Sequence, residues 1–226
     1  IALLGILISV DLFQVQDRMQ KEYKDRDRVE KQYFKETATD KFLAKDSETF
    51  RIFPVGKLFG DNRWAYFHQT IGGYSPIKMY TIEELVEKNI YKGWDADLPL
   101  NWNVLKLLNV KYVVLQGQVQ NENLERVFAE QQAGLVTYRL KGALSRAFFV
   151  NEFKVIPGEI ERLKYINSQK FNPAQTAILE LESAEKIEAP DSAFTKLTSF
   201  SPNKITYDVF TDKQALLVLS EVYYPP

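Results

Sequence analysis

The chain has 226 residues, a formal net charge of −1 and no cysteine. The near-zero charge provides no basic field, so we expect no nucleic-acid partner. The lack of cysteine excludes disulfides, thiolate catalysis and cysteine-based metal sites.

The first thirteen residues are almost wholly apolar, and basic and acidic residues alternate after them. A helix of thirteen residues is about 20 Å long, against about 30 Å of membrane hydrocarbon. We therefore interpret residues 1–13 as the end of a transmembrane helix that starts before this sequence. Residues 14–38 would be a charged stalk or linker. The alternative is a buried N-terminal helix of a soluble protein, against which the lack of a polar face argues.

Residues 39–156 are expected to form a mixed α/β domain. Asn101 can cap a helix over residues 102–108, and Asn109 suits the left-handed position that often ends a helix. The continuous apolar run at residues 111–116 is typical of a central strand. The other expected elements are a short helix that ends at residue 44 and is capped by Thr39 or Asp40, helices over residues 76–90 and 123–132, an extended or irregular segment at 64–70, and strands at 49–55, 135–140 and 147–156.

Residues 157–226 are expected to form a smaller, antiparallel, β-rich subdomain. A short helix over residues 159–168 precedes strands at 176–181, 194–200, 205–210 and 215–222. We expect its sheet to continue beyond the end of this sequence. The whole pattern predicts the α+β class: a mixed sheet with flanking helices, followed by this β-rich part.

Few residues suggest catalysis or metal binding. His68 is the only histidine, and its aromatic neighbours indicate a packed position, with a hydrogen bond to a polar ligand as the functional alternative. Asp95 and Asp97 have the spacing by which two loop carboxylates can hold a divalent cation, a pattern that also arises by chance. Gly72 and Gly73 fit a tight turn, because no phosphate-loop pattern surrounds them. We therefore predict no catalytic residue, no metal and no cofactor.

Aromatic residues beside polar ones suggest a carbohydrate site in two loops, at residues 61–75 and 93–101. Flat apolar faces next to polar groups bind sugars, although the same composition occurs in any partly buried loop. The predicted ligand-binding residues are Arg63, Trp64, His68, Tyr74, Trp94, Asp95, Asp97 and Trp102. Outside this set, Arg146 interrupts an apolar strand. We expect it to pair with a carboxylate or to lie on an edge strand.

Six short segments, taken in order, resemble the YfhO-like family of bacterial multi-spanning membrane proteins. They are VDL at residues 10–12, YFH at 66–68, IGGYSPIK at 71–78, LLNVKYV at 107–113, LSRAFFV at 144–150 and LLVLSEVYYP at 216–225. The chain is most similar to the long extracytoplasmic region that follows the membrane helices in that family. There the Tyr-Tyr-Pro element usually continues into Gly-Trp and further strands.

The resemblance implies a membrane glycosyltransferase that uses lipid-linked sugars and modifies cell-envelope glycans or polymers. Its catalytic acidic residue would lie outside this chain, so no catalytic position is assigned. The chain would be a non-catalytic accessory domain in the bacterial cell membrane, with its soluble part extracytoplasmic. Its partners would be the membrane-embedded part of the same protein and a glycan or envelope polymer.

Two other functions stay open from the sequence. A structural or protein-interaction domain with no ligand would bury Trp94 and Trp102 in its core. An autonomous enzyme is the less favoured alternative, because the chain offers one histidine, no cysteine and no evident pair of catalytic carboxylates.

Overall fold

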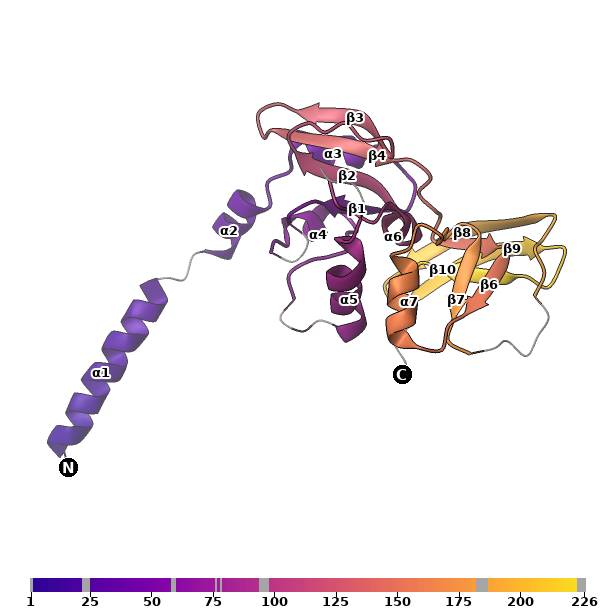
Figure 1. Ribbon diagram of the computed structural model, residues 1–226. Helices are drawn as coiled ribbons and strands as arrows, with labels where there is room; N and C mark the ends of the chain where they lie inside the picture. Colours follow the sequence, from indigo (N-terminus) through magenta and orange to yellow (C-terminus); the bar gives the residue numbers. More distant parts are fainter. Residues whose placement is uncertain are drawn as a thin grey trace. The chain divides into compact units, whose positions relative to one another are not determined.

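The computed structural model describes residues 2–21, 25–57, 60–75, 77, 79–93, 98–181 and 187–222 (Figure 1). The chain divides into two compact units, residues 1–37 and residues 38–226.

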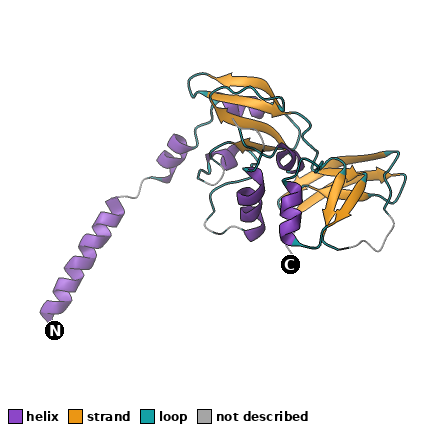
Figure 2. Ribbon diagram, in the orientation of Figure 1, coloured by secondary structure: helices purple, strands orange, loops and turns teal. Residues whose placement is uncertain are grey.

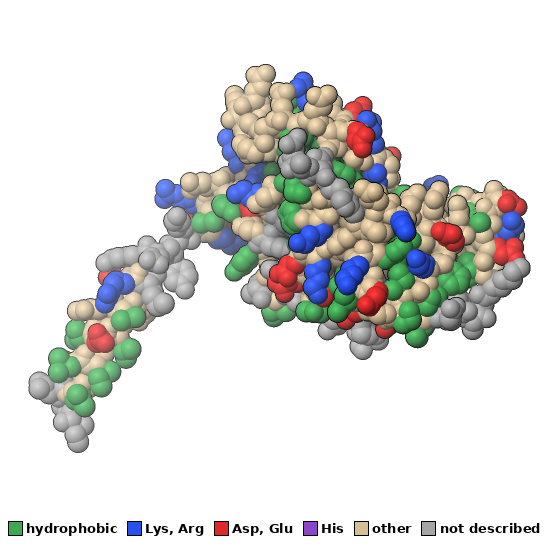
Figure 3. Space-filling model, in the orientation of Figure 1, with side chains coloured by type: hydrophobic (Ala, Val, Ile, Leu, Met, Phe, Trp, Pro, Cys, Tyr) green, Lys and Arg blue, Asp and Glu red, His purple; other side chains and the backbone are tan. Residues whose placement is uncertain are grey.

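The first unit contains two helices, α1 (Ala2–Lys21) and α2 (Arg26–Tyr33). The side chain of Asp25 caps α2 by accepting a hydrogen bond from the backbone N–H of Asp27. The apolar side chains of the first half of α1 are exposed and appear green in Figure 3. Charged residues follow them in the second half of the helix. Among the described residues, no helix has the apolar length that crossing a membrane requires.

The second unit is built on a four-stranded mixed sheet, as expected. Its strands are β1 (Arg51–Pro54), β2 (Val110–Gln116), β3 (Leu124–Glu130) and β4 (Leu135–Leu140), in the order β1-β2-β4-β3. β1 and β2 are parallel, and the other neighbours are antiparallel. The continuous apolar run therefore forms an interior strand, β2, which is buried on both faces.

Helices cover the two faces of this sheet (Figure 2). On one face lie α5 (Tyr80–Leu85), the π-helical turn η1 (Val86–Ile90) and α6 (Trp102–Leu107), whose apolar side chains form the larger core cluster with Phe53 and Val113. On the other lie α3 (Ala38–Leu43) and α4 (Arg63–Phe67), which form a smaller cluster with Ile52 and Tyr112. Alternate residues of β1 and β2 therefore point into different clusters, as a pleated strand requires.

The expected ends of α6 are confirmed. The side chain of Asn101 accepts a hydrogen bond from the backbone N–H of Val104 and caps the helix. Asn109 adopts φ 58°, the left-handed conformation predicted for it.

The remaining strands form three two-stranded sheets. β5 (Ala147–Val150) pairs with β10 (Leu216–Leu219), and β8 (Ala193–Ser201) pairs with β9 (Lys204–Thr211), both antiparallel. β6 (Glu152–Val155) pairs in parallel with β7 (Thr176–Leu179), and α7 (Glu159–Ile166) connects them. The predicted α+β class is confirmed. Strand pairing crosses the expected domain boundary at residue 157, because β5 and β6 both pair with later strands.

Several predicted elements are wrong in detail. Residues 124–130 form strand β3 where a helix was expected over 123–132. Residues 63–67 form α4 where an extended or irregular segment was expected over 64–70. The segment 147–156 divides into two strands, β5 and β6, with different partners.

The helix predicted over residues 76–90 begins later, at Tyr80, with Met79 before it. Ser75 does not cap it. Its hydroxyl accepts a hydrogen bond from the N–H of Ile77 and donates one to the carbonyl of the same residue. This local turn competes with helix formation and delays the start of α5. Pro76 lies outside the described residues.

Candidate functional site

A concavity of about 560 Å³ lies beside α6. We name it the α6 cavity. It is lined by residues 100–103, residues 120–123 and Gln169. The lining joins the start of α6, the loop between β2 and β3, and the segment after α7.

Amide side chains dominate the part of this lining that the structure describes, with one indole among them. Asn and Gln each offer a donor and an acceptor, so the wall presents both kinds of group. The side chains of Gln120, Glu122 and Gln169 make no hydrogen bond to the part of the chain that the structure describes. They are exposed and free to bind a ligand.

Other lining side chains are held in place. Asn103 Nδ2 donates to the carbonyl of Phe171 at 2.7 Å. Asn121 Oδ1 accepts from the backbone N–H of Asn123 at 2.9 Å, and Lys106 Nζ donates to Asn123 Oδ1 at 3.3 Å. Burial lowers the pKa of Lys106, and the nearby carboxylate of Glu122 opposes that shift. The wall thus combines hydrogen-bonded amides with exposed ones.

Trp102, the one predicted site residue among the described residues that line this cavity, is partly buried. It packs against the larger core cluster and also lines the cavity. Its position on the first turn of α6, directly after the capping Asn101, follows from the helix start that the sequence predicts. The indole is therefore held by the core while part of it remains accessible.

Three other predicted residues, Arg63, Trp64 and His68, meet around a buried carboxylate. Asp40, 1% exposed, forms ion pairs with Arg63 and with His68, whose Nε2 lies 2.9 Å from Asp40 Oδ1. The Arg63 guanidinium lies over the Trp64 ring, 4.9 Å from its centroid. Trp64 is itself buried in the smaller core cluster.

This buried charge network joins α3 to α4 and does not line the α6 cavity. The His68 ring contacts Asp40, and within the described residues no hydroxyl nucleophile hydrogen-bonds to that ring. The arrangement therefore supports the fold and lacks the nucleophile that a hydrolytic triad needs.

The remaining predicted residues are placed less specifically. Tyr74 is exposed, and its backbone N–H donates to Asn62 Oδ1 at 2.6 Å. Trp94, Asp95 and Asp97 lie outside the described residues. In the part of the chain that is described, no group of His, Asp and Glu side chains could hold a metal ion.

The amides at residues 120–123 were missed in the sequence because a helix was expected from residue 123 onward. The signal was nonetheless present: five of the eight residues from Gln116 to Asn123 carry an amide side chain. Such a run favours a loop over a helix, since short polar side chains compete for backbone hydrogen bonds.

Comparison with known proteins adds no identity: no known protein family, no curated protein and no solved structure matches this chain.

Proposed function

We propose that this chain is a non-catalytic, glycan-binding accessory domain of a multi-spanning membrane glycosyltransferase. It would act on the extracytoplasmic side of a bacterial cell membrane, where the parent protein modifies envelope glycans or polymers. The observation that carries the binding role is the accessible indole of Trp102 beside the amide wall of the α6 cavity.

The chemistry of this cavity suits a neutral sugar. Each sugar hydroxyl is both donor and acceptor, and the amides of Gln120 and Gln169 offer both complementary groups. The C–H face of a pyranose ring is apolar and packs on a flat indole. A volume of about 560 Å³ falls within the range of small-molecule sites, about 300–1,000 Å³.

The lining also favours binding over catalysis. Among the lining residues that the structure describes, Glu122 is the one carboxylate, and there is no histidine. Glycoside chemistry normally requires two carboxyl groups that flank the scissile bond. A ligand bound here would therefore be held without being cleaved.

The membrane setting rests on two sequence features. The first half of α1 is apolar and its side chains are exposed. The six segments that resemble the YfhO-like family extend from α1 to the end of the chain. Partners in this proposal are the membrane-embedded part of the same protein and an envelope glycan.

A panel of neutral oligosaccharides, titrated calorimetrically into the full chain, tests the proposal. We expect saturable binding by at least one of them, with a dissociation constant near 1 mM, about −4 kcal/mol. Trp102→Ala should weaken binding about tenfold or more, whereas Trp102→Phe, which keeps a flat face, should retain most of it.

Tyr74→Ala is the matched control, because Tyr74 is an exposed aromatic residue that does not line the cavity. Its binding should equal that of the unaltered chain. Absence of binding at about 10 mM ligand, or equal losses in Trp102→Ala and Tyr74→Ala, would contradict the proposal and favour a structural domain with no ligand.

A further inference from the structure

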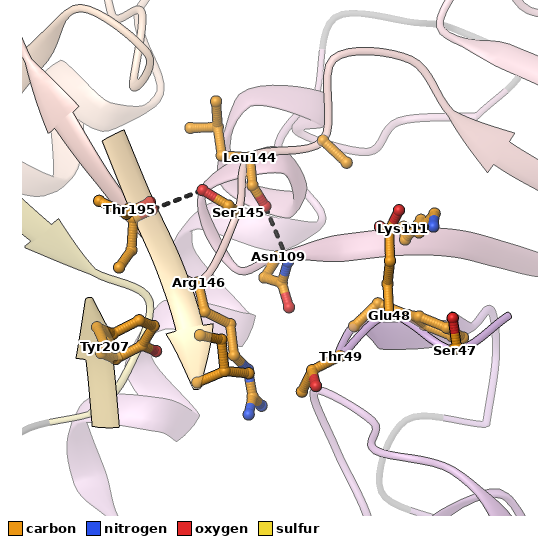
Figure 4. A pocket seen from close by; sticks show the side chains of 14 residues that line it. Ser47, Glu48, Thr49, Asn109, Lys111, Leu144, Ser145, Arg146, Thr195 and Tyr207 are labelled. Atoms are coloured by element: carbon orange, nitrogen blue, oxygen red, sulfur yellow. Dashed lines mark hydrogen bonds and ion pairs between the residues drawn. The ribbon is translucent and has the colours of Figure 1, made fainter. Parts of the chain in front are cut away.

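A second cavity, of about 450 Å³, lies between β2, the segment before β5 and the β8–β9 hairpin (Figure 4). We name it the Arg146 cavity. Its lining includes Thr49, Asn109, Arg146 and Tyr207. Figure 4 shows the Arg146 guanidinium between Tyr207 and Thr49, with the side-chain oxygen of Asn109 directed towards the same space.

Buried polar atoms without a hydrogen-bonding partner gather at this cavity. Within the described residues they are Asn109 Oδ1, Arg146 Nη1 and Tyr207 Oη, whereas Arg146 Nε and Oε1 of the adjacent Glu221 face each other as an ion pair. Buried polar groups are nearly always hydrogen-bonded, because leaving such a group without a partner costs about 1–3 kcal/mol. Several such atoms in one place are the feature expected of a binding site.

Arg146 is the centre of this group and is 5% exposed. Its Nη2 donates to Gln69 Oε1 at 2.5 Å, and its Nε lies 3.3 Å from Glu221 Oε1. The guanidinium also lies over the Phe200 ring, 4.5 Å from the centroid. Of the two alternatives expected for Arg146, a carboxylate partner or an edge strand, the first is found, and the partner is Glu221.

Glu221 does not neutralise Arg146 alone, because Arg51 shares it. Arg51 Nη2 lies 2.7 Å from Glu221 Oε2, and Arg51 Nη1 donates to the carbonyls of Leu108 and Ser220. Two guanidiniums and one carboxylate leave one positive charge in excess. Burial, and then the charge of Arg51, lower the pKa of Arg146, while Glu221 opposes them.

One carboxylate, that of Glu48, also lines the cavity, and its side chain is 73% exposed. Lys111 Nζ pairs with Glu48 at 2.8 Å and with Asp46, which is 17% exposed and does not line the cavity, at 2.6 Å. Water and salt screen an exposed charge strongly, and they screen a buried charge much less. The excess positive charge at Arg146 therefore governs what the interior of the cavity attracts.

We propose that the Arg146 cavity binds an anionic group, a carboxylate or a phosphate, with a hydroxyl on the carbon next to the one that bears the anion. The anion pairs with Arg146 Nη1 and accepts a hydrogen bond from Tyr207 Oη. The neighbouring hydroxyl donates to Asn109 Oδ1. Uronic acids and glycerol phosphates are the two sources of this chemistry.

Tyr207 is suited to donate. Burial, and then Glu221, raise the pKa of its phenol, so the hydroxyl stays protonated at neutral pH. The site uses none of the residues of the α6 cavity, so it stands independently of the function proposed above.

The test is calorimetric titration with glucuronate, glycerol phosphate and glucose at constant ionic strength. The full chain carrying Trp102→Ala is the reference, so that the α6 cavity makes no contribution. Saturable millimolar binding by glucuronate, glycerol phosphate or both is expected, and glucose should not bind. The anion that binds identifies the source.

Two further substitutions in that reference locate the binding. Arg146→Met should weaken it about ten- to hundredfold, the effect of losing a hydrogen bond to a charged group. Tyr207→Phe should weaken it by up to about tenfold. It deletes only a hydroxyl that has no partner in the described chain, so it leaves the fold intact even if Arg146→Met does not fold.

The proposal is overturned if neither anion binds saturably by about 10 mM. It is equally overturned if Tyr207→Phe leaves the affinity unchanged. Loss of neutral-glycan binding in the unaltered chain bears only on the α6 cavity, so the two proposals fail separately.

Discussion

At the scale of single residues, Asp40 is a buried carboxylate that holds together the charged side chains between α3 and α4. It pairs with Arg63 and His68, and the Arg63 guanidinium in turn lies over Trp64 and Phe67. A carboxylate 1% exposed is tolerated only with such partners, because an unpaired buried charge costs several kcal/mol.

Asp40→Asn should lower the free energy of unfolding by about 3 kcal/mol, since Arg63 would keep its charge without a counter-ion. Urea denaturation measures this loss. Asp208→Asn makes the same chemical change at an exposed position of β9 and should cost under about 0.5 kcal/mol. Equal losses in the two variants would show that the buried network contributes nothing to stability.

Asp46 titrates under opposing influences. Burial alone would raise its pKa, but hydrogen bonds from Lys111 and Tyr112 outweigh burial, and the net pKa is lowered. The folded protein therefore binds fewer protons than the unfolded chain near pH 4. This stabilisation is present above the unfolded pKa and is lost as the pH falls through the folded value.

Asp46→Asn should consequently flatten the acid limb of the stability curve. Between about pH 5 and pH 2 the unaltered chain should lose more unfolding free energy than the variant. Urea titrations at a series of pH values provide the comparison. Curves that stay parallel through that range would mean that Asp46 does not couple to folding.

The sequence pointed to some of these residues without their partners. Arg63 and His68 stand out as a loop arginine and the only histidine, whereas Asp40 suggests only a helix cap. Their pairing joins residues 23 and 28 positions apart. Such contacts depend on how α3 and α4 pack, which no local pattern encodes.

At the scale of elements, a set of asparagines connects α7 to the sheet's helices. Asn167 Oδ1 accepts from Asn89 Nδ2 at 2.9 Å and from Asn101 Nδ2 at 3.2 Å. Its own Nδ2 donates to the carbonyl of Lys88 at 2.7 Å. One side chain after α7 thus holds both η1 and the start of α6.

Asn167→Ala should lower the unfolding free energy by about 2 kcal/mol, because it leaves buried amide donors with fewer acceptors. It should also increase hydrogen exchange in α7. Asn203→Ala, in the exposed turn between β8 and β9, is the matched control and should have little effect. A loss no larger than that of the control would mean that α7 is held by its apolar contacts alone.

Gly93 lies against the backbone before α6. A Cβ at this position would lie 2.0 Å from the carbonyl oxygen of Leu100, and the Gly93 N–H donates to the carbonyl of Pro99. Because that close neighbour is backbone, it cannot move aside as a side chain would.

Gly93→Ala should therefore destabilise the protein by about 1–3 kcal/mol. Gly60→Ala places its Cβ in open space and should change stability by less than about 1 kcal/mol. Thermal unfolding of the two variants decides the matter. If Gly93→Ala unfolds at the same temperature as Gly60→Ala, the close approach does not exist in solution.

Strand β3 shows why a pattern can mislead at this scale. Leu124, Val127 and Phe128 have helical spacing, yet they lie on a strand. An irregularity between Arg126 and Phe128 shifts the register against β4, so the strict alternation of a strand is lost. Val127 then packs with the smaller core cluster and Phe128 stacks on Phe42, while Leu124 joins the larger cluster.

At the scale of the whole molecule, the α+β class and the central position of β2 could be predicted from the sequence. A continuous apolar run predicts a strand that is buried on both faces. The pairing of β5 with β10, which lie about seventy residues apart in sequence, could not be predicted, because alternation sets which face a strand buries and does not set its partner.

In each of the two cavities, the sequence indicated one residue and did not indicate the residues around it. Trp102 was predicted as a ligand-binding residue from composition, and its amide neighbours come from loops that only the fold assembles. Arg146 was recognised as an anomaly in an apolar strand, but Asn109 and Tyr207 come from segments far from it in sequence. Composition can identify one wall of a site, and tertiary structure is needed for the others.

The most direct measurement is the NMR spectrum of the indole N–H groups of the full chain during titration with a neutral oligosaccharide. The Trp102 signal is assigned as the one that Trp102→Phe removes. The Trp102 signal should shift and saturate at the calorimetric dissociation constant, while that of buried Trp64 should stay in place. A Trp102 signal that does not move while sugar binds, or no response at all, would contradict a glycan-binding role for the α6 cavity.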